Sequence, residues 1–272
     1  MSEFYEQVET YYDGDAEDFD ARYWKNRVLQ RIRQDFREEV KRHPFQSMLE
    51  IGYGSGLDMV HFGMTHPDSR VTGIDISAAM QDLARQKIAR HALNNVTAEK
   101  GSVEDLQEIY PRQQFDMIYV FFGALNTVED LDKAAEYLHE VTAPGGRLVL
   151  SFVNRNYAAG TVIELLKLRF RAAFARHKKE WGGYSPTQYL PSRCYTPRTI
   201  RKAFSRFSLV RQKGYSIVHP AWYYHGLNRL VSRASPYLWK TDQMLNKTFL
   251  WSWGEYTLFV FEKPDARSTQ KR

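Results

Sequence analysis

Short apolar runs alternate with amphipathic segments through the first half of the chain. The runs are rich in Val, Ile, Leu, Met and Phe, which is typical of strands buried on both faces of a parallel sheet. Between them, apolar residues recur at three- and four-residue steps, as on one face of a helix. This alternation predicts a parallel, doubly wound α/β sheet with right-handed crossovers. The predicted strands lie at residues 48–51, 70–75, 96–100, 115–122 and 147–153.

Regular patterns also flank this region. Before it, apolar residues at helical spacing run over residues 21–42, and Pro44 ends the predicted helix. After it, the sequence predicts a helix at residues 196–204 and a strand at residues 207–218. A last strand at residues 254–262 is expected to close the sheet in the antiparallel direction.

Two stretches, residues 154–195 and 219–253, do not fit this pattern and are interpreted as insertions. Both follow the carboxyl end of a parallel strand, where open α/β sheets bind ligands. The first contains a predicted basic amphipathic helix at residues 165–179, and the second is rich in aromatic residues such as Trp222. Apolar walls with a cationic rim suit a ligand with an apolar body and a negative group. Alternatively, the aromatic residues pack the insertions against the core and the basic helix is a solvated face.

Charge is distributed unevenly along the 272 residues. Residues 1–153 contain 16 Lys and Arg against 26 Asp and Glu, whereas residues 154–272 contain 22 against 6. A basic segment of this kind predicts contact with something anionic, such as a phosphorylated substrate, a membrane surface or nucleic acid. The alternative is a solvated basic surface that balances the acidic half.

Size and composition point to one domain, residues 1–272, that carries the insertions. The single cysteine, Cys194, excludes a disulfide within the chain. No run of about 18 apolar residues could span a membrane. The first residues lack the basic start and apolar stretch of a signal peptide, so we expect a cytoplasmic location.

Three glycines spaced two apart, Gly52, Gly54 and Gly56, follow the first strand, and Glu50 lies two residues before them. Glycine allows a tight turn with positive φ and lets a ligand approach the main chain. The dinucleotide fingerprint G-x-G-x-x-G needs its third glycine one position later, where this chain has Leu57. The turn is therefore Rossmann-like without being the NAD form.

The pattern E-x-G-x-G-x-G resembles motif I of the class I S-adenosylmethionine (SAM) dependent methyltransferases. The resemblance implies SAM as cofactor, with its methionine portion on a turn formed by Glu50, Gly52, Tyr53, Gly54 and Gly56. It also implies a seven-stranded sheet of order 3-2-1-4-5-7-6, with the last strand antiparallel, helices on both faces and the insertions on the substrate face.

The resemblance further divides the domain by role. Residues 1–46 are expected to form an N-terminal helix and lid over the cofactor, and residues 47–153 the half that binds SAM. Tyr12 belongs to an aromatic pair that either contributes to the lid or simply packs.

Asp75 ends the second predicted strand, 19 residues after Gly56. A carboxylate at this place can accept hydrogen bonds from both ribose hydroxyls, and in the family the next residue, Ile76, covers the adenine. Gly101 begins a loop that resembles the adenine loop of the family. Ser102 stands where the family usually has Asp, so Glu104 or the backbone of Val103 is expected to recognise the adenine instead.

Phe121, Phe122 and Asn126 follow the fourth strand and are expected to line the junction of cofactor and acceptor. Enzymes that methylate amino groups in nucleic acid carry Asp/Asn/Ser-Pro-Pro-aromatic at this place, which this chain lacks. The loop resembles that of methyltransferases acting on small molecules. For the two phenylalanines, burial in the core is the alternative.

An acceptor oxygen that is not ionised needs a base, and histidine is the usual one. His219, at the end of the sixth strand, and His225, in the second insertion, are the two histidines placed near the acceptor, although a structural role is the alternative for each. Acidic residues at 129, 130 and 132 begin a helix and are interpreted as partners of its dipole. No metal is predicted.

The sequence therefore predicts a SAM-dependent methyltransferase that methylates O or N of a small or lipid-like, anionic acceptor. Two alternatives stay open. The basic second half, with a charge of +16 over residues 154–272, fits an RNA methyltransferase. Ser102 and the absence of a clear base fit a noncatalytic SAM-binding subunit. Peripheral membrane contact is also open, and nothing indicates the oligomeric state.

Overall fold

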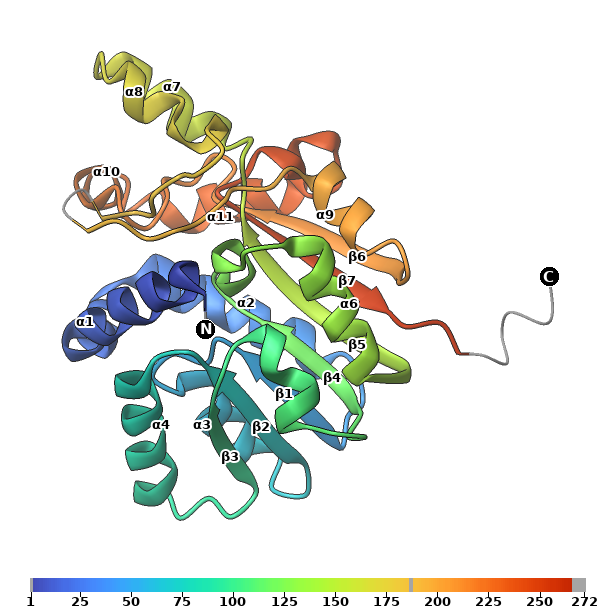
Figure 1. The fold of residues 1–272 in the computed structure, drawn as a ribbon. Helices are drawn as coiled ribbons and strands as arrows, with labels where there is room; N and C mark the ends of the chain where they lie inside the picture. Colours follow the sequence, from blue (N-terminus) through green and yellow to red (C-terminus); the bar gives the residue numbers. More distant parts are fainter. Residues whose placement is uncertain (1, 186–187, 266–272) are drawn as a thin grey trace, which may run out of the picture.

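The structure is a computed structural model that describes residues 2–185 and 188–265 (Figure 1). Seven strands form one sheet in the order β3-β2-β1-β4-β5-β7-β6. Only β7 runs antiparallel to its neighbours. The predicted fold class and strand order are confirmed. The strands are β1 (Ser47–Ile51), β2 (Arg70–Asp75), β3 (Val96–Lys100), β4 (Phe115–Val120), β5 (Thr142–Val153), β6 (Ser208–Tyr215) and β7 (Tyr256–Glu262).

Helices cover both faces of the sheet, and each face has its own core. One core joins the sheet to α5 (Leu106–Ile109), α6 (Leu131–Val141) and α9 (Pro197–Ala203). The other core joins it to four helices, which are α2 (Arg27–Lys41), α3 (Leu57–Thr65), α4 (Ala78–Arg90) and α11 (Ser235–Leu245). The central strands are buried on both faces, which explains why their sequences are almost continuously apolar.

The N-terminal segment differs from the prediction of one helix over residues 21–42. It forms α1 (Glu3–Lys25) and then α2, because Asn26 leaves the helical conformation and its side chain accepts hydrogen bonds from the N–H groups of Val28 and Leu29. A side-chain cap of this kind favours a new helix start. The apolar spacing continues across Asn26, so periodicity alone did not reveal the break.

The first insertion also differs from the prediction of a basic helix at residues 165–179. Here α7 (Ala158–Leu166) ends, Leu168 adopts a positive φ of 57°, and the short α8 (Phe170–Ala173) turns back. The second insertion contains α10 (His225–Leu230) and α11. In Figure 1, α7 and α8 project beyond the sheet and beyond α10. Within the described ranges, none of the helices is long and apolar enough to cross a membrane.

A buried ion cluster fixes α2 against the start of α3. Arg33 Nη1 lies 2.5 Å from Asp58 Oδ2, and Arg37 Nε lies 2.6 Å from Asp58 Oδ1. Arg37 also donates to the carbonyl of Leu57. The Asp58 side chain is only 2% exposed, so water does little to screen these contacts.

Replacement of Asp58 by Ala should destabilise the protein by about 3–5 kcal/mol, because it leaves two guanidinium groups without a counter-ion in a region of low solvent exposure. Equilibrium urea unfolding measures the change. The matched control is Glu38→Ala, which removes the exposed 3.3 Å pair with Lys41 and should cost less than about 1 kcal/mol. Equal effects of the two substitutions would contradict this account of the cluster.

Candidate functional site

Two adjoining cavities lie at the carboxyl ends of the parallel strands. The first has an empty volume of about 830 Å³ and the second about 1250 Å³, parts open to solvent included. Tyr12, Phe19, Phe122 and Thr127 line both cavities, so they form their common boundary. This edge of the sheet is where open α/β folds bind their ligands.

The glycine turn forms one wall of the first cavity. Gly52 and Gly54 have φ values of +69° and +55°, a region that side chains disfavour. A Cβ on Gly52 would lie 2.5 Å from the Cβ of Ala124. The turn is therefore limited to glycine at residue 52 by both backbone conformation and space.

Asp75 lines the same cavity from the end of β2. Its Oδ2 accepts from the N–H of Gly54 at 2.7 Å, and its Oδ1 accepts from the N–H of Ser77 at 3.0 Å. Burial raises the pKa of Asp75 to about 6, although these backbone hydrogen bonds lower it. The carboxylate thus connects the glycine turn to the start of α4 and retains acceptor capacity for a ligand.

The loop after β3 contributes Gly101, Ser102 and Val103 to the first cavity. Ser102 donates from its N–H and its Oγ to Asp105 Oδ2, at 2.7 Å and 2.9 Å. Its side chain therefore serves to cap the short helical turn Val103–Asp105. Val103 is buried, with 3% of its surface exposed, and its side chain can pack against a flat ligand.

Helix α1 covers the first cavity with Tyr5, Val8, Tyr12 and Phe19, and two of its acidic residues attach it to the site. Asp13 Oδ1 accepts from Ser77 Oγ at 2.5 Å and from the N–H of Ala79 at 3.1 Å. Further along, Asp20 accepts from Ser55 Oγ and lies 2.6 Å from Lys87 Nζ. The acidic, aromatic composition of this segment thus has two functions, since the aromatic face covers the cavity and the acids attach the helix.

Aromatic side chains from both insertions form the walls of the second cavity. Trp181 and Tyr184 come from the first insertion, Trp222 comes from the second, and Tyr256 comes from β7. The rings of Trp181 and Tyr184 lie 4.5 Å apart, and those of Tyr184 and Trp222 lie 5.2 Å apart. The two insertions therefore meet at this cavity.

Arg33 places a cation on the wall of this aromatic cavity. Its guanidinium carbon lies 4.4 Å from the ring centre of Tyr23 and 4.8 Å from that of Phe122. The side chain is 8% exposed, and its Nε has no hydrogen-bond partner. Together with Arg37 it provides two cations against Asp58. Burial raises the pKa of nearby Glu50 well above its ordinary value, which favours a neutral acid there and leaves the cluster with excess positive charge.

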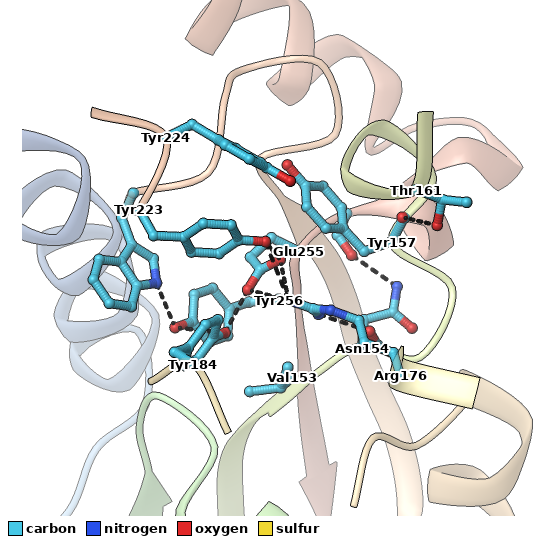
Figure 2. A network of polar contacts seen from close by, with 12 residues as sticks. Val153, Asn154, Tyr157, Thr161, Arg176, Tyr184, Tyr223, Tyr224, Glu255 and Tyr256 are labelled. Carbon is cyan, nitrogen blue, oxygen red and sulfur yellow. Dashed lines mark hydrogen bonds and ion pairs between the residues drawn. The ribbon is translucent and has the colours of Figure 1, made fainter. Parts of the chain in front are cut away.

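Figure 2 shows a second buried network beside this cavity, centred on Glu255. Both carboxylate oxygens accept from Arg176 Nη2, at 2.8 Å and 2.7 Å. The hydroxyl groups of Tyr184 and Tyr223 also donate to Glu255, and Trp222 Nε1 donates to the hydroxyl of Tyr256 at 3.1 Å. This network holds both insertions to the start of β7.

Most of the predicted site residues line the two cavities. Asn126 and Trp222 line the second cavity, and Tyr12 and Phe122 line both. The amide of Asn126 is already engaged with the backbone of Val153 and Arg193, so it fixes the loop. The predicted cofactor residues that line the first cavity are Gly52, Gly54, Asp75, Ile76, Ser102, Val103 and Phe121.

The other four predicted cofactor residues, Glu50, Tyr53, Gly56 and Glu104, lie outside the lining of the first cavity. Glu50 accepts from the Tyr119 hydroxyl at 2.9 Å, and Tyr53 donates to the carbonyl of Glu99 at 3.0 Å. A Cβ on Gly56 would lie 2.8 Å from the Cβ of Ala84. Glu104 accepts from the Tyr5 hydroxyl at 3.2 Å. These residues support the cavity walls in this structure.

Neither histidine proposed as a base lines a cavity. His219 is buried, its Nδ1 donates to the carbonyl of Pro220, and its Nε2 accepts from Ser235 Oγ, both at 2.9 Å. His225 is exposed at the first turn of α10. Among the residues that the structure describes, no group of three His, Cys, Asp or Glu side chains could hold a metal ion.

Several lining residues were not predicted. Val8 and Phe19 follow the helical spacing of α1, so this signal was available in the acidic N-terminal segment. Nothing in the sequence marks Arg33 as a cavity residue, because an arginine within an amphipathic helix is ordinarily solvated. Tyr184 and Tyr256 are distant in sequence and are brought together by the insertion and β7.

Comparisons with known proteins agree with this architecture. A family model described as a methyltransferase domain matches residues 43–190, more than half of the chain. A demethylmenaquinone methyltransferase of Symbiobacterium thermophilum is 26% identical over 149 residues, which cover 52% of this chain and 57% of the relative. The chain thus spans about half the length of the curated relatives it matches.

Two solved structures share the fold at low sequence identity. Geranyl diphosphate C-methyltransferase from Streptomyces coelicolor A3(2), in complex with Mg²⁺, geranyl diphosphate and S-adenosyl-L-homocysteine, is 14% identical, with 96% of this chain and 98% of that chain covered and a TM-score of 0.61. The 4+2 cyclase SpnF is 15% identical, with coverages of 88% and 82% and a TM-score of 0.58. With the strand order described above and the family match, these findings establish that the chain belongs to the methyltransferase domain family and has the class I, Rossmann-like fold.

Proposed function

We propose that the protein is a SAM-dependent methyltransferase acting on a small or lipid-like acceptor. The observation that carries this proposal is the pair of adjoining cavities. One is built around the glycine turn and Asp75, and the other is lined by aromatic side chains from the two insertions. A donor and an acceptor held on either side of Phe122 would lie next to each other, as in-line transfer of a methyl group requires.

In this proposal, SAM supplies an electrophilic methyl group, and the protein orients it and excludes water. The backbone at Gly52 and Gly54 leaves room for the methionine portion. Asp75 accepts from the ribose hydroxyls, and Ile76 and Val103 line the cavity where the adenine would bind. A structural neighbour solved with S-adenosyl-L-homocysteine supports this choice of cofactor.

The roles of the segments follow from the same proposal. Residues 1–46 provide the lid through α1, residues 47–153 bind SAM, and residues 154–195 and 219–253 form the acceptor site. The support is that α1 lines the first cavity and that both insertions line the second.

For the acceptor, the lining of the second cavity favours an apolar or aromatic body with an anionic oxygen. The aromatic rings would pack against the body, and Arg33 would pair with the oxygen. A nearby cation also stabilises the ionised form of an acidic hydroxyl. Since no histidine of the described residues lines either cavity, we propose that the acceptor binds as its anion after releasing its proton to bulk water, and that Arg33 stabilises this ionised form.

The relatives support an acceptor of this class. One is named for demethylmenaquinone, and a structural neighbour holds geranyl diphosphate. Each of these molecules combines an apolar isoprenoid portion with oxygen-bearing groups.

The direct test incubates the protein with trideuteriomethyl SAM and an extract containing small molecules and lipids, and mass spectrometry then follows the label. We expect one class of product to gain the trideuteriomethyl group. Gly52→Val should abolish labelling, because a side chain there meets Ala124 and the positive φ is strained. Gly145→Val is the matched control, since Gly145 also has a positive φ, of 75°, but a Cβ there meets nothing within 4 Å and the residue lines neither cavity. Binding of SAM without label in any fraction would favour a noncatalytic SAM-binding subunit. Label in RNA would favour an RNA methyltransferase.

Asp75 should make SAM binding depend on pH. A carboxylate accepts hydrogen bonds from hydroxyl groups more strongly than a neutral acid does, and the pKa of Asp75 is about 6 in the free protein. Its neutral form therefore dominates below that pH, and the Kd for SAM should rise about tenfold between about pH 7.5 and pH 5. Calorimetric titration of the wild type and Asp75→Asn checks this, because the titration of SAM itself is common to both. Parallel pH profiles for the two proteins would contradict the assigned role.

Arg33 should give the second cavity a preference for anions. We expect 2-hydroxy-1,4-naphthoquinone, which is anionic at neutral pH, to bind at least about tenfold more tightly than neutral 1,4-naphthoquinone, and Arg33→Gln to remove the preference. Fluorescence quenching of the cavity tryptophans measures both affinities. Arg22→Gln is the control, because Arg22 lines the same cavity but its side chain is 53% exposed, against 8% for Arg33. A preference that survives in Arg33→Gln would exclude this role.

A further inference from the structure

A helical hairpin within the first insertion projects from the molecule. It consists of α7, a turn at Leu168 and α8, and Figure 1 shows it extending beyond the sheet and the other helices. Large apolar side chains are exposed along it, with Leu166 at 80%, Leu168 at 76% and Phe170 at 60%. Val162 and Phe174 are also more than half exposed. Such a concentration of apolar surface on one projecting element indicates a contact surface.

Cations are interleaved with these apolar side chains. Lys167, Arg169 and Arg171 alternate with the three most exposed apolar residues, and Lys178 and Lys179 follow. Over residues 158–179 the chain has six Lys and Arg and a single acidic residue, Glu164. The hairpin therefore combines exposed apolar side chains with a net positive charge.

We propose that this hairpin docks on the surface of an anionic lipid bilayer. In such a contact the leucine and phenylalanine side chains enter the boundary between headgroups and acyl chains, and the cations pair with lipid phosphates. The alternation of the two kinds of side chain distinguishes this partner from RNA, which requires the cations but gains nothing from Leu166 or Leu168. Sequence charge alone did not separate the two partners, whereas the exposure of the apolar residues does.

Neighbouring elements extend the same surface. Ile163 of α7 and Leu227 of α10 pack against a common apolar cluster, so the two helices lie together. Beyond that contact, Leu230 is 80% exposed and is flanked by Arg229 and Arg233. The docking surface therefore includes both insertions.

The base of the hairpin is attached to the wall of the second cavity. Arg176 follows α8, and its guanidinium is bound by Glu255, which also accepts from Tyr184 (Figure 2). Tyr184 lines the second cavity. Docking at the hairpin would thus bring a bilayer close to the proposed acceptor site, which suits an acceptor that partitions into lipid. The docking itself does not rest on the proposed methyl transfer.

Co-sedimentation with vesicles tests the proposal on the full chain. The wild type should bind phosphatidylcholine vesicles containing about one quarter phosphatidylglycerol at least about tenfold more tightly than pure phosphatidylcholine vesicles, and added salt should weaken the binding. Leu166→Ser/Phe170→Ser should weaken it by about tenfold or more. Arg171→Glu/Lys178→Glu should remove the preference for anionic lipid.

Met64→Ser/Val210→Ser is the matched control, because these two exposed apolar residues lie on α3 and β6. It should bind vesicles as the wild type does, and the thermal unfolding transition of every variant, followed by circular dichroism, reports whether the fold is intact. Equal binding of the wild type to neutral and anionic vesicles would overturn the proposal, as would loss of binding in the control alone. Tighter binding to bulk tRNA than to anionic vesicles at the same salt, or burial of the hairpin in a dimer detected by sedimentation, would also overturn it.

Discussion

The carboxylate of Asp58 connects the start of α3 to the wall of the second cavity through Arg33. It lies in the first turn of α3, directly after the glycine turn, and it holds Arg33 and Arg37 of α2. Arg33 continues from this contact over the ring of Phe122 to the second cavity. Two neighbouring cations are not buried without a counter-ion, so the placement of α2 and the cation beside the aromatic walls depend on the same carboxylate.

The sheet could be predicted because each strand carries a local signal. Near-continuous apolar runs mark β4 and β5, shorter apolar runs mark β1 and β2, and Asp75 and the three glycines mark the ends of β2 and β1. The boundary between two helices could not be predicted where the same apolar spacing runs through both. Asn26 separates α1 from α2 through a side-chain cap, and the apolar spacing on either side conceals it.

The acceptor side of the site depends on contacts between distant parts of the chain. Arg176 and Glu255 are 79 residues apart, and Tyr184 and Tyr256 are 72 apart. Composition predicted aromatic walls and cations in the insertions but could not pair them, because each pairing is set by how the insertions pack onto β7. For the same reason, the burial of Arg33 depends on Asp58, which a helical pattern does not reveal.

Helix α1 has a consequence for the exchange of ligands. Its carboxylates Asp13 and Asp20 bind groups directly after Asp75 and within the glycine turn, so α1 is attached to the same backbone that forms the first cavity. Exit of a molecule past this helix requires those hydrogen bonds and the contact with Lys87 to separate. If the first cavity holds the donor, detachment of α1 would widen the route by which the donor and the spent cofactor exchange, so the helix would influence off-rates as well as cover the cavity.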